Sequence, residues 1–173
     1  MDWYVLRTIS GKEDVCHSIF QKVFPEFEII YPKRRLGWRK NGRVISLVRP
    51  MFEGYLFVST DKIWKLDHLL RRCGMNTAWL TRSAGSLVPI FAEEKQLIQR
   101  LIGNTGIAEI SELERSKDQV KVVNGPLIGL EHVIRKISGR NRRITAEFPV
   151  LGEKKKIELE GYIINSEQKE LLK

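Results

Sequence analysis

The sequence predicts an α+β protein in two parts, an amino-terminal α/β sandwich with three helices and a carboxy-terminal five-stranded β-barrel. Three observations lead to this prediction. Strand and helix signals alternate closely up to residue 103, a polar and weakly periodic segment covers 104–117, and only strand signals come after it. We therefore expect one domain at 1–103, a linker at 104–117 and a second domain at 118–173.

Apolar spacing and turn residues predict the elements of the first part. Ser10 and Glu13 have the spacing of a capping box, so a helix should follow them. Its apolar stripe runs from Val15 to Phe24. Asn41-Gly42 predicts a hairpin turn inside a basic stretch. The other expected elements are strands at 3–8, 28–31, 44–48, 49–59 and 77–81, and helices between Asp61 and Gly74 and at 92–102.

The second part reads as short strands separated by the turn sequences NGPLIG, SGRN and LGEK. Five short strands in about fifty residues are typical of a small barrel. A domain of this size has a thin core, and closing the sheet into a barrel also removes exposed strand edges.

Composition points to a polyanionic partner. The 173 residues carry a net charge of +9, which favours binding to nucleic acid or another anionic surface. No apolar run is long enough to span a bilayer, and the N-terminus lacks the apolar block of a signal peptide. We therefore expect a cytoplasmic protein with no membrane partner. Cys16 and Cys73 form no CxxC pair and are expected to be buried.

No motif predicts an enzyme. The stretch 37–42 has the glycine spacing of a P-loop, but Arg43 and Val44 stand where a lysine and a serine or threonine are required. The three histidines have no partners at metal-ligand spacing, and no serine or cysteine nucleophile motif is present. We expect no catalysis, no metal and no cofactor.

The strand GYLFVS is apolar on both faces. Tyr55 and Phe57 share one face, and Leu56 and Val58 share the other. Either a helical layer covers each face, or the face with Tyr55 is open and receives a helix from a partner. The residues alone leave both alternatives open.

The predicted barrel carries a group of eight cations. Its members are Arg135, Lys136, Arg140, Arg142, Arg143, Lys154, Lys155 and Lys156. If the loops SGRN and GEKKK meet at one end of the barrel, these residues share a face that can bind RNA phosphates; otherwise they form a solvated surface. No aromatic residue interrupts the group, so structured RNA such as a hairpin is a better expectation than base stacking.

Three stretches in this order, WYVLRTISGKE, MFEGYLFV and DQVKVVNGPLIGLEHVI, resemble the NusG family of transcription elongation factors. The resemblance covers nearly the whole chain. It implies a NusG amino-terminal domain with an antiparallel sheet and a carboxy-terminal KOW domain, which is an SH3-like barrel. The family commonly has Phe-Pro-Gly-Tyr where this chain has Phe52-Glu53-Gly54-Tyr55, so the aromatic positions are kept but the proline of the family pattern is absent.

The resemblance also implies partners. Family members bind the clamp helices of the largest subunit of RNA polymerase through an apolar patch, which Phe52, Tyr55 and Phe57 match here. This favours the open aromatic face and a factor that suppresses pausing without chemistry of its own. The basic segment 33–43 is then an arm near DNA, or simply a solvated arm. Residues that could contact upstream or non-template DNA are Lys12, His17, Arg34, Arg35, Arg39 and Lys40.

General members of the family bind Rho or a small-subunit ribosomal protein through the KOW domain. Specialised paralogues such as RfaH and LoaP act as antiterminators at particular operons. The basic KOW face makes this chain most similar to the LoaP kind, so we expect a monomeric processive antiterminator that is recruited by an RNA hairpin. A general adaptor for Rho or the ribosome and a ribosome-associated RNA-binding protein are the alternatives.

Overall fold

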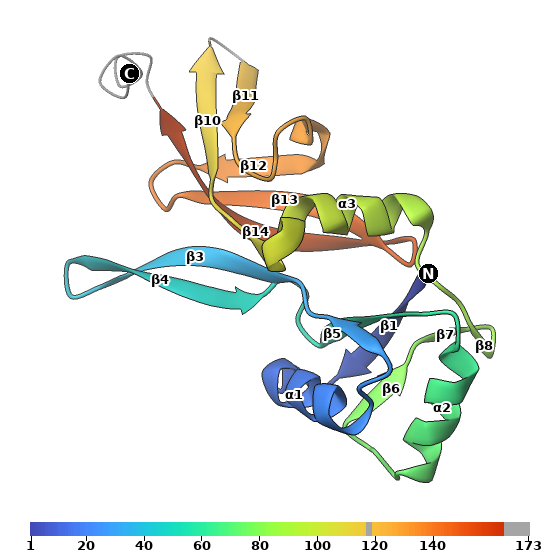
Figure 1. Ribbon diagram of the computed structural model, residues 1–173. Coiled ribbons are helices and arrows are strands. Elements are labelled where there is room, and N and C mark those ends of the chain that lie inside the picture. The colour runs from blue at the N-terminus through green and yellow to red at the C-terminus, as the bar shows by residue number, and fades with distance from the viewer. Residues whose placement is uncertain (117–118, 165–173) are drawn as a thin grey trace.

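The computed structural model describes residues 1–116 and 119–164 and confirms the predicted α+β class (Figure 1). The amino-terminal part is built on a sheet with strand order β2-β5-β1-β6. Its paired strands are all antiparallel. The strands of this sheet are β1 (Asp2–Thr8), β2 (Glu28–Ile30), β5 (Tyr55–Thr60) and β6 (Ala78–Leu80).

Two helices, α1 (Glu13–Val23) and α2 (Ile63–Arg72), cover one face of this sheet. Phe20 of α1 and Leu66 of α2 are fully buried in a cluster with Leu56 of the central strand β5. A third helix, α3 (Ala92–Ile102), belongs to the cluster on the opposite face of the sheet. A small hairpin of β7 (Arg82–Ser83) and β8 (Ser86–Leu87) precedes α3.

The basic stretch forms the predicted hairpin of β3 (Lys33–Lys40) and β4 (Arg43–Pro50). Asn41 and Gly42 at its turn have φ angles of 50° and 77°, the left-handed geometry that a two-residue hairpin turn requires. The short strand β9 (Ile107–Ala108) pairs with the start of β3 to complete a three-stranded sheet. The hairpin lies alongside the carboxy-terminal sheet (Figure 1).

The carboxy-terminal part is one five-stranded sheet with strand order β11-β10-β14-β13-β12. Its longest strand, β14, pairs with β13 along its first part and in parallel with β10 near its end. The strands are β10 (Ser111–Ser116), β11 (Gln119–Asn124), β12 (Ile134–Ser138), β13 (Arg143–Val150) and β14 (Glu153–Ile164). Segment 104–117, which the sequence analysis expected to be a linker, therefore supplies β9 and β10.

The predicted capping box before α1 is wrong. The N-cap residue of α1 is Lys12, and no side chain caps the helix. The Glu13 carboxylate is buried and instead accepts a hydrogen bond of 2.7 Å from the backbone N–H of Gly54, so it ties the helix to the turn before β5. The buried face of α1 is also narrower than the predicted apolar stripe, because Val15 is 56% exposed. Of the two cysteines, Cys16 is buried as expected, whereas Cys73 is exposed.

The two parts of the chain share one hydrophobic core. A single cluster of buried residues runs from Trp3 and Phe57 through Ile98 of α3 to Phe148 and Leu159 of the carboxy-terminal sheet. The two domains are therefore docked, with α3 packed against β13 and with β3 packed against β14. This contact decides which of the predicted site residues are accessible.

Candidate functional site

The aromatic face that was expected to be open is covered in this structure. Phe57 is fully buried and Phe52 is 5% exposed, while Tyr55 is half-buried at the edge of the cluster. The Phe57 ring lies 5.8 Å from the Trp3 ring and 6.0 Å from the Phe52 ring, centroid to centroid. The cover is α3 together with the second domain, because both contribute to the same buried cluster.

Tyr55 forms polar contacts to both domains. The Arg7 guanidinium donates from Nη1 to the Tyr55 hydroxyl at 2.8 Å. The Lys155 ammonium of β14 lies 5.3 Å from the centre of the Tyr55 ring. The pKa of Lys155 is raised, first by its hydrogen bond to Glu153 and then by Tyr55, so its charge is stabilised at this boundary. Lys155, expected to bind RNA, thus lies against the expected polymerase face.

Glu94 is a polar link between the domains near the start of α3. Its side chain is buried, and its carboxylate accepts hydrogen bonds from the backbone N–H groups of Leu151 (3.0 Å) and Gly152 (2.9 Å) in the β13–β14 turn. It also accepts one from Phe91 N–H at 3.1 Å, where it satisfies the first turn of its own helix. In the last turn of α3, Arg100 donates to the backbone oxygen of Ile128.

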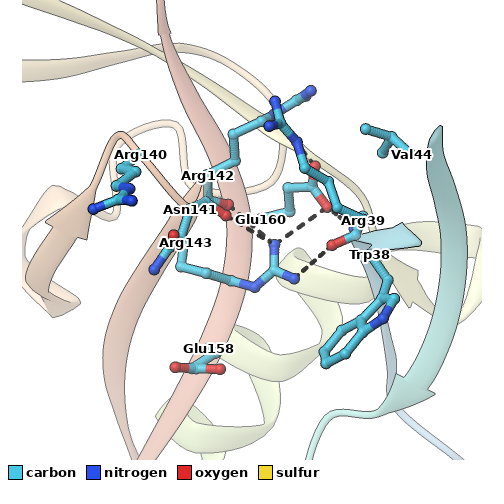
Figure 2. A pocket seen from close by; sticks show the side chains of 10 residues that line it. Trp38, Arg39, Val44, Arg140, Asn141, Arg142, Arg143, Glu158 and Glu160 are labelled. Atoms are coloured by element: carbon cyan, nitrogen blue, oxygen red, sulfur yellow. Dashed lines mark hydrogen bonds and ion pairs between the residues drawn. The ribbon is translucent and has the colours of Figure 1, made fainter. Parts of the chain in front are cut away.

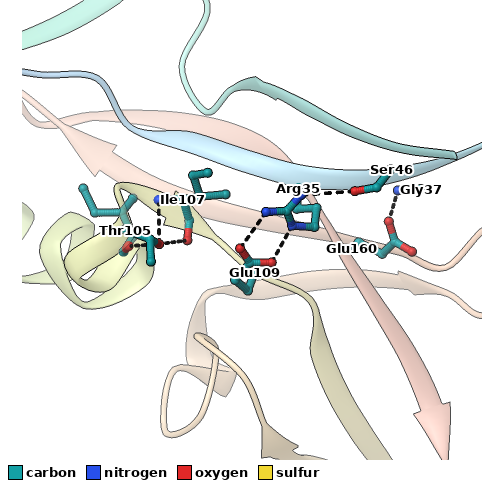
Figure 3. A network of polar contacts seen from close by, with 8 residues as sticks. Arg35, Gly37, Ser46, Thr105, Ile107, Glu109 and Glu160 are labelled. Carbon is teal, nitrogen blue, oxygen red and sulfur yellow. Dashed lines mark hydrogen bonds and ion pairs between the residues drawn. The ribbon is translucent and has the colours of Figure 1, made fainter.

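A second link joins the hairpin to β14 (Figures 2 and 3). The Glu160 carboxylate is 2% exposed and accepts a hydrogen bond from Gly37 N–H, while Arg143 donates from Nη2 to Gly37 O at 2.6 Å. The Glu160 and Arg143 side chains thus hydrogen-bond to the N–H and the C=O group of Gly37, on the open edge of β3. A Cβ at position 37 would lie 2.8 Å from Glu160 Oε1, so a larger residue there would displace the Glu160 carboxylate.

Glu160 also forms ion pairs with two arginines at the loop that was expected to bind RNA. Arg142 Nε lies 3.4 Å from Glu160 Oε1, and Arg143 Nη1 lies 3.7 Å from Glu160 Oε2. The Arg142 guanidinium stacks over the ring of Tyr162 at 4.8 Å. Two of the predicted RNA-binding arginines are therefore engaged at the domain boundary.

The predicted RNA-binding residues do not form one face. The register of β13 and β14 pairs Arg143 with Glu160 at one end and Val150 with Glu153 at the other, so the loops 139–142 and 151–152 lie at opposite ends of these strands. The two loops therefore do not meet at one end of the barrel, as a shared RNA-binding face would require. Arg135 and Lys154 are near the Glu147 carboxylate, at 3.4 and 3.7 Å.

Three predicted RNA-binding residues are paired with no acid in the part of the chain that the structure describes: Lys136, Arg140 and Lys156. All three are exposed. They remain the cations most available to a phosphate.

The predicted DNA-contact residues divide into two groups. Lys12, Arg39 and Lys40 are exposed. Arg34 is half-buried; burial lowers its pKa, and its Nη1 donates to the backbone oxygen of Glu158 at 2.5 Å. Arg35 forms a two-pronged pair with Glu109, at 2.6 and 3.0 Å, which raises its pKa (Figure 3).

His17 is half-buried on α1, and its ring centre lies 5.6 Å from that of Tyr31. Burial lowers the pKa of its imidazole. In the described residues no group of three or more His, Cys, Asp or Glu side chains could hold a metal ion. Likewise, no helix within 1–116 or 119–164 is long and apolar enough to cross a membrane.

Comparison with known proteins identifies the relationship. The family model described as "Transcription termination factor nusG" matches residues 1–102, more than half of the chain. The chain belongs to the NusG family. It is therefore a NusG-type transcription termination/antitermination factor, and the family's members are non-enzymatic.

Relatives match this NusG-family chain along nearly its whole length. The transcription termination/antitermination protein NusG of Pseudomonas aeruginosa is 25% identical over 166 residues, which cover 91% of this chain and 94% of that protein. The protein of the same name from Thermus thermophilus is 22% identical over 182 residues, covering 92% and 95%. The solved structure "Domain interaction in Thermotoga maritima NusG" matches with a TM-score of 0.55 and 22% identity, over 92% of this chain and 93% of that one.

Sequence reasoning missed three residues of this boundary: Gly37, Glu94 and Glu160. The two acids are buried and bond to backbone groups 58 and 123 residues away, so no local spacing identifies them. A weak signal existed for Glu160, since it stands among the apolar residues at the end of β14.

Proposed function

We propose that this protein is a processive antiterminator of the LoaP kind, which binds RNA polymerase through its aromatic face and structured RNA through its basic KOW domain. One observation carries the proposal. The face with Phe52, Tyr55 and Phe57 is covered by α3 and by a second domain of the same chain, whereas α1 and α2 cover the other face. A face that a separate domain covers can be uncovered without unfolding the sheet.

Polymerase binding requires the two domains to separate, since the clamp helices and the KOW domain compete for the same aromatic face. The docked form then holds the factor inactive, and only the separated fraction is competent. The apparent affinity for polymerase is lowered in proportion to that fraction. Several polar links at the boundary involve exposed or half-buried arginines, which water can replace when the domains part.

RNA binding is supported by three cations that have no acidic partner among the residues that the structure describes. Lys136 lies on β12 and Arg140 in the β12–β13 turn, and Lys156 lies two strands away on β14. Their charges are available to phosphates while the domains are docked. Counterion release would then make RNA binding strongly dependent on salt.

The test measures binding of the full chain to fluorescein-labelled RNA hairpins across a salt series. Lys136→Ala combined with Arg140→Ala should weaken binding and flatten the slope of log K against log salt by about 0.7–0.9 for each lost phosphate contact. The control is Lys62→Ala with Arg72→Ala, which removes the same charge from exposed positions around α2. An equal loss in both double variants would mean that net charge alone matters.

A general elongation factor whose KOW domain is an adaptor for Rho or the ribosome is the alternative outcome. It is supported by the relatives named NusG, since the chain matches 94% and 95% of their lengths. Weak binding to every hairpin, with no effect of either double variant, would favour this alternative.

A further inference from the structure

One face of the β3–β4 hairpin forms an exposed cleft with the second domain. Trp38 is paired with Ile45 across the hairpin and Leu36 with Leu47, so these four apolar side chains share one face. Trp38 is 58% exposed and Ile45 is 40% exposed. An exposed tryptophan within an apolar strip of this kind usually marks an interaction site.

The second domain closes this cleft with one cation and one acid. Arg143 and Glu158 line it together with the hairpin residues, and its volume is about 370 Å³. The Arg143 guanidinium is held in place by Gly37 O and Glu160, and in Figure 2 it lies above the opening between the Trp38 ring and the Glu158 carboxylate. Glu158 is exposed, so its carboxylate can accept hydrogen bonds from a ligand.

Cations surround the apolar strip. Lys40 and Arg49 lie on the same strand face as Trp38 and line the cleft. A neighbouring hollow of about 510 Å³ shares Trp38, Arg143 and Glu158 with it. This hollow continues to Arg140 and Arg142 in the β12–β13 loop, so a chain that leaves the cleft on this side meets further positive charge.

We propose that this cleft binds one unpaired nucleotide of the RNA, with its base stacked on Trp38 and its flanking phosphates on Lys40 and Arg49. The inference rests on the RNA binding proposed above and adds the site at which a base is read. The cleft combines a flat exposed ring, an apolar floor and a cationic rim, which are the groups that bind a nucleotide. Its volume lies within the range of about 300–1,000 Å³ that holds small ligands.

Glu158 gives the site a base preference. A carboxylate accepts from N–H groups and repels oxygen acceptors, so it favours bases with donors on the Watson–Crick edge. Guanine presents two neighbouring donors there, N1–H and the N2 amino group, whereas uracil presents one N–H between two carbonyl oxygens. We therefore expect guanine to be preferred over uracil at the stacked position.

The sequence could not reveal the whole site, because Trp38, Lys40 and Arg49 lie on the hairpin whereas Arg143 and Glu158 come from the second domain. The KOW cations have no aromatic residue among them, which argued against stacking. The fold places Trp38 beside Arg143, which follows it by more than one hundred residues. Because Arg143 and Glu158 come from the second domain, the complete set of groups that line the cleft is present while the domains are docked.

The test uses the full chain and a set of fluorescein-labelled RNA hairpins that differ at one unpaired loop nucleotide, which is G, A, C, U or abasic. Trp38→Ala should lower the affinity for the G hairpin about 5- to 150-fold, and Trp38→Phe should retain most of it. The Trp38→Ala variant and the wild type should bind the abasic hairpin with equal affinity. Trp64→Ala, which changes a 64%-exposed tryptophan on α2, is the matched control.

Two further readouts separate a binding role from a structural one. In a Trp64→Phe/Trp79→Phe background, RNA should quench the fluorescence of Trp38, because a stacked base lies against the indole. Glu158→Gln should reduce the preference for G over U with little change in affinity for the abasic hairpin. A merely structural Trp38 would give neither quenching nor dependence on the base.

The outcomes distinguish this inference from the proposed function. If Trp38→Ala leaves hairpin affinity unchanged while Lys136→Ala with Arg140→Ala lowers it, RNA is bound through phosphates alone and the nucleotide cleft is wrong. If the wild-type chain binds no hairpin, the proposed RNA binding fails as well. Equal affinity for the corresponding DNA hairpins would overturn RNA as the ligand of this cleft.

Discussion

The two faces of the amino-terminal sheet are buried in different ways. Leu56 and Val58 are covered by α1 and α2, which lie next to them in the same domain. Phe57 is covered by α3 and by strands of the second domain, and some of these residues lie about one hundred positions further along the chain. Leu56 and Phe57 are both fully buried, yet the cluster around Leu56 lies within one domain, whereas the cluster around Phe57 extends into the second domain.

This difference shows why burial alone does not separate a structural core from a binding face. Phe57 and Leu56 are both fully buried, although adjacent side chains of one strand point to opposite faces. The distinguishing feature is which part of the chain provides the cover. Under the function proposed above, the second domain moves away and this apolar surface is presented to RNA polymerase.

The largest effect that we expect concerns polymerase binding. Tyr55→Ala should lower the affinity of the full chain for bacterial RNA polymerase by about 30-fold or more, since a central aromatic residue of an interface typically contributes about 2 kcal/mol or more. Surface plasmon resonance with immobilised core polymerase would measure this change.

The matched control for this prediction is Tyr4→Ala. Tyr4 is also half-buried in the same sheet, but it packs against the cluster under α1 and α2. It should leave polymerase affinity within about twofold of wild type, an estimate that follows from the small effect of substitutions outside an interface. Equal losses for Tyr4 and Tyr55 would show that the two faces do not differ in function.

A smaller effect is expected at the link between the domains. Glu160→Gln removes the charge that faces Arg142 and Arg143 and weakens the bond to Gly37 N–H, which should destabilise docking by about 1.5–3 kcal/mol. Amide hydrogen exchange should then increase in β3 and α3, and the apparent affinity for polymerase should rise because more molecules are competent.

Glu147→Gln is the control for this variant. Glu147 also lies near two cations, Arg135 and Lys154, but all three belong to the second domain. The control should leave exchange in β3 and α3 unchanged. Faster exchange in both variants would mean that Glu160 stabilises only its own domain and does not hold the two domains together.

The smallest effect concerns pH and belongs to the side of the sheet that α1 covers. Burial lowers the pKa of His17 in the folded state, so the unfolded state binds more protons below its ordinary pKa of about 6.5. Stability is therefore highest above about pH 6.5 and falls as the pH drops below this value, because protonation of His17 then favours the unfolded state. In urea unfolding, His17→Gln should flatten the pH dependence in this range.

The pH range of this effect distinguishes His17 from the acidic residues. The pKa values of Glu26, Glu131 and Glu153 are lowered by their hydrogen bonds, so these groups lose stabilising contributions only at more acidic pH. His68→Gln, which changes an exposed histidine of α2, tests whether loss of any histidine has the same effect. An unchanged profile for His17→Gln would mean that its burial is not maintained in solution.

Local signals predicted much of the fold. Helix α3 spans Ala92–Ile102 as expected, because its apolar spacing and Gly103 define both ends. The hairpin turn at Asn41-Gly42 was found because two left-handed residues are needed there. In contrast, β10 has the polar sequence SELERS, in which Leu113 is buried and most of the other side chains are polar, so it resembled a linker.

The candidate site was less predictable for a physical reason. The aromatic face and the cations could be named from their types, but their accessibility depends on contacts between residues that are far apart in sequence. Arg143 was expected to face RNA, and it instead bonds to a backbone oxygen 106 positions earlier. No periodicity or spacing contains that information, whereas docking of the two domains determines it directly.

The open edge of β3 has a further consequence for the separated protein. Beyond Arg34, the structure describes no strand that pairs with this edge, and Glu160 and Arg143 occupy it at Gly37. When the domains part, unpaired backbone groups of an eight-residue strand become accessible, and such an edge can template pairing with another chain. Arg39 and Lys40, which are exposed on this strand, would then oppose such pairing, because like charges on two copies repel each other.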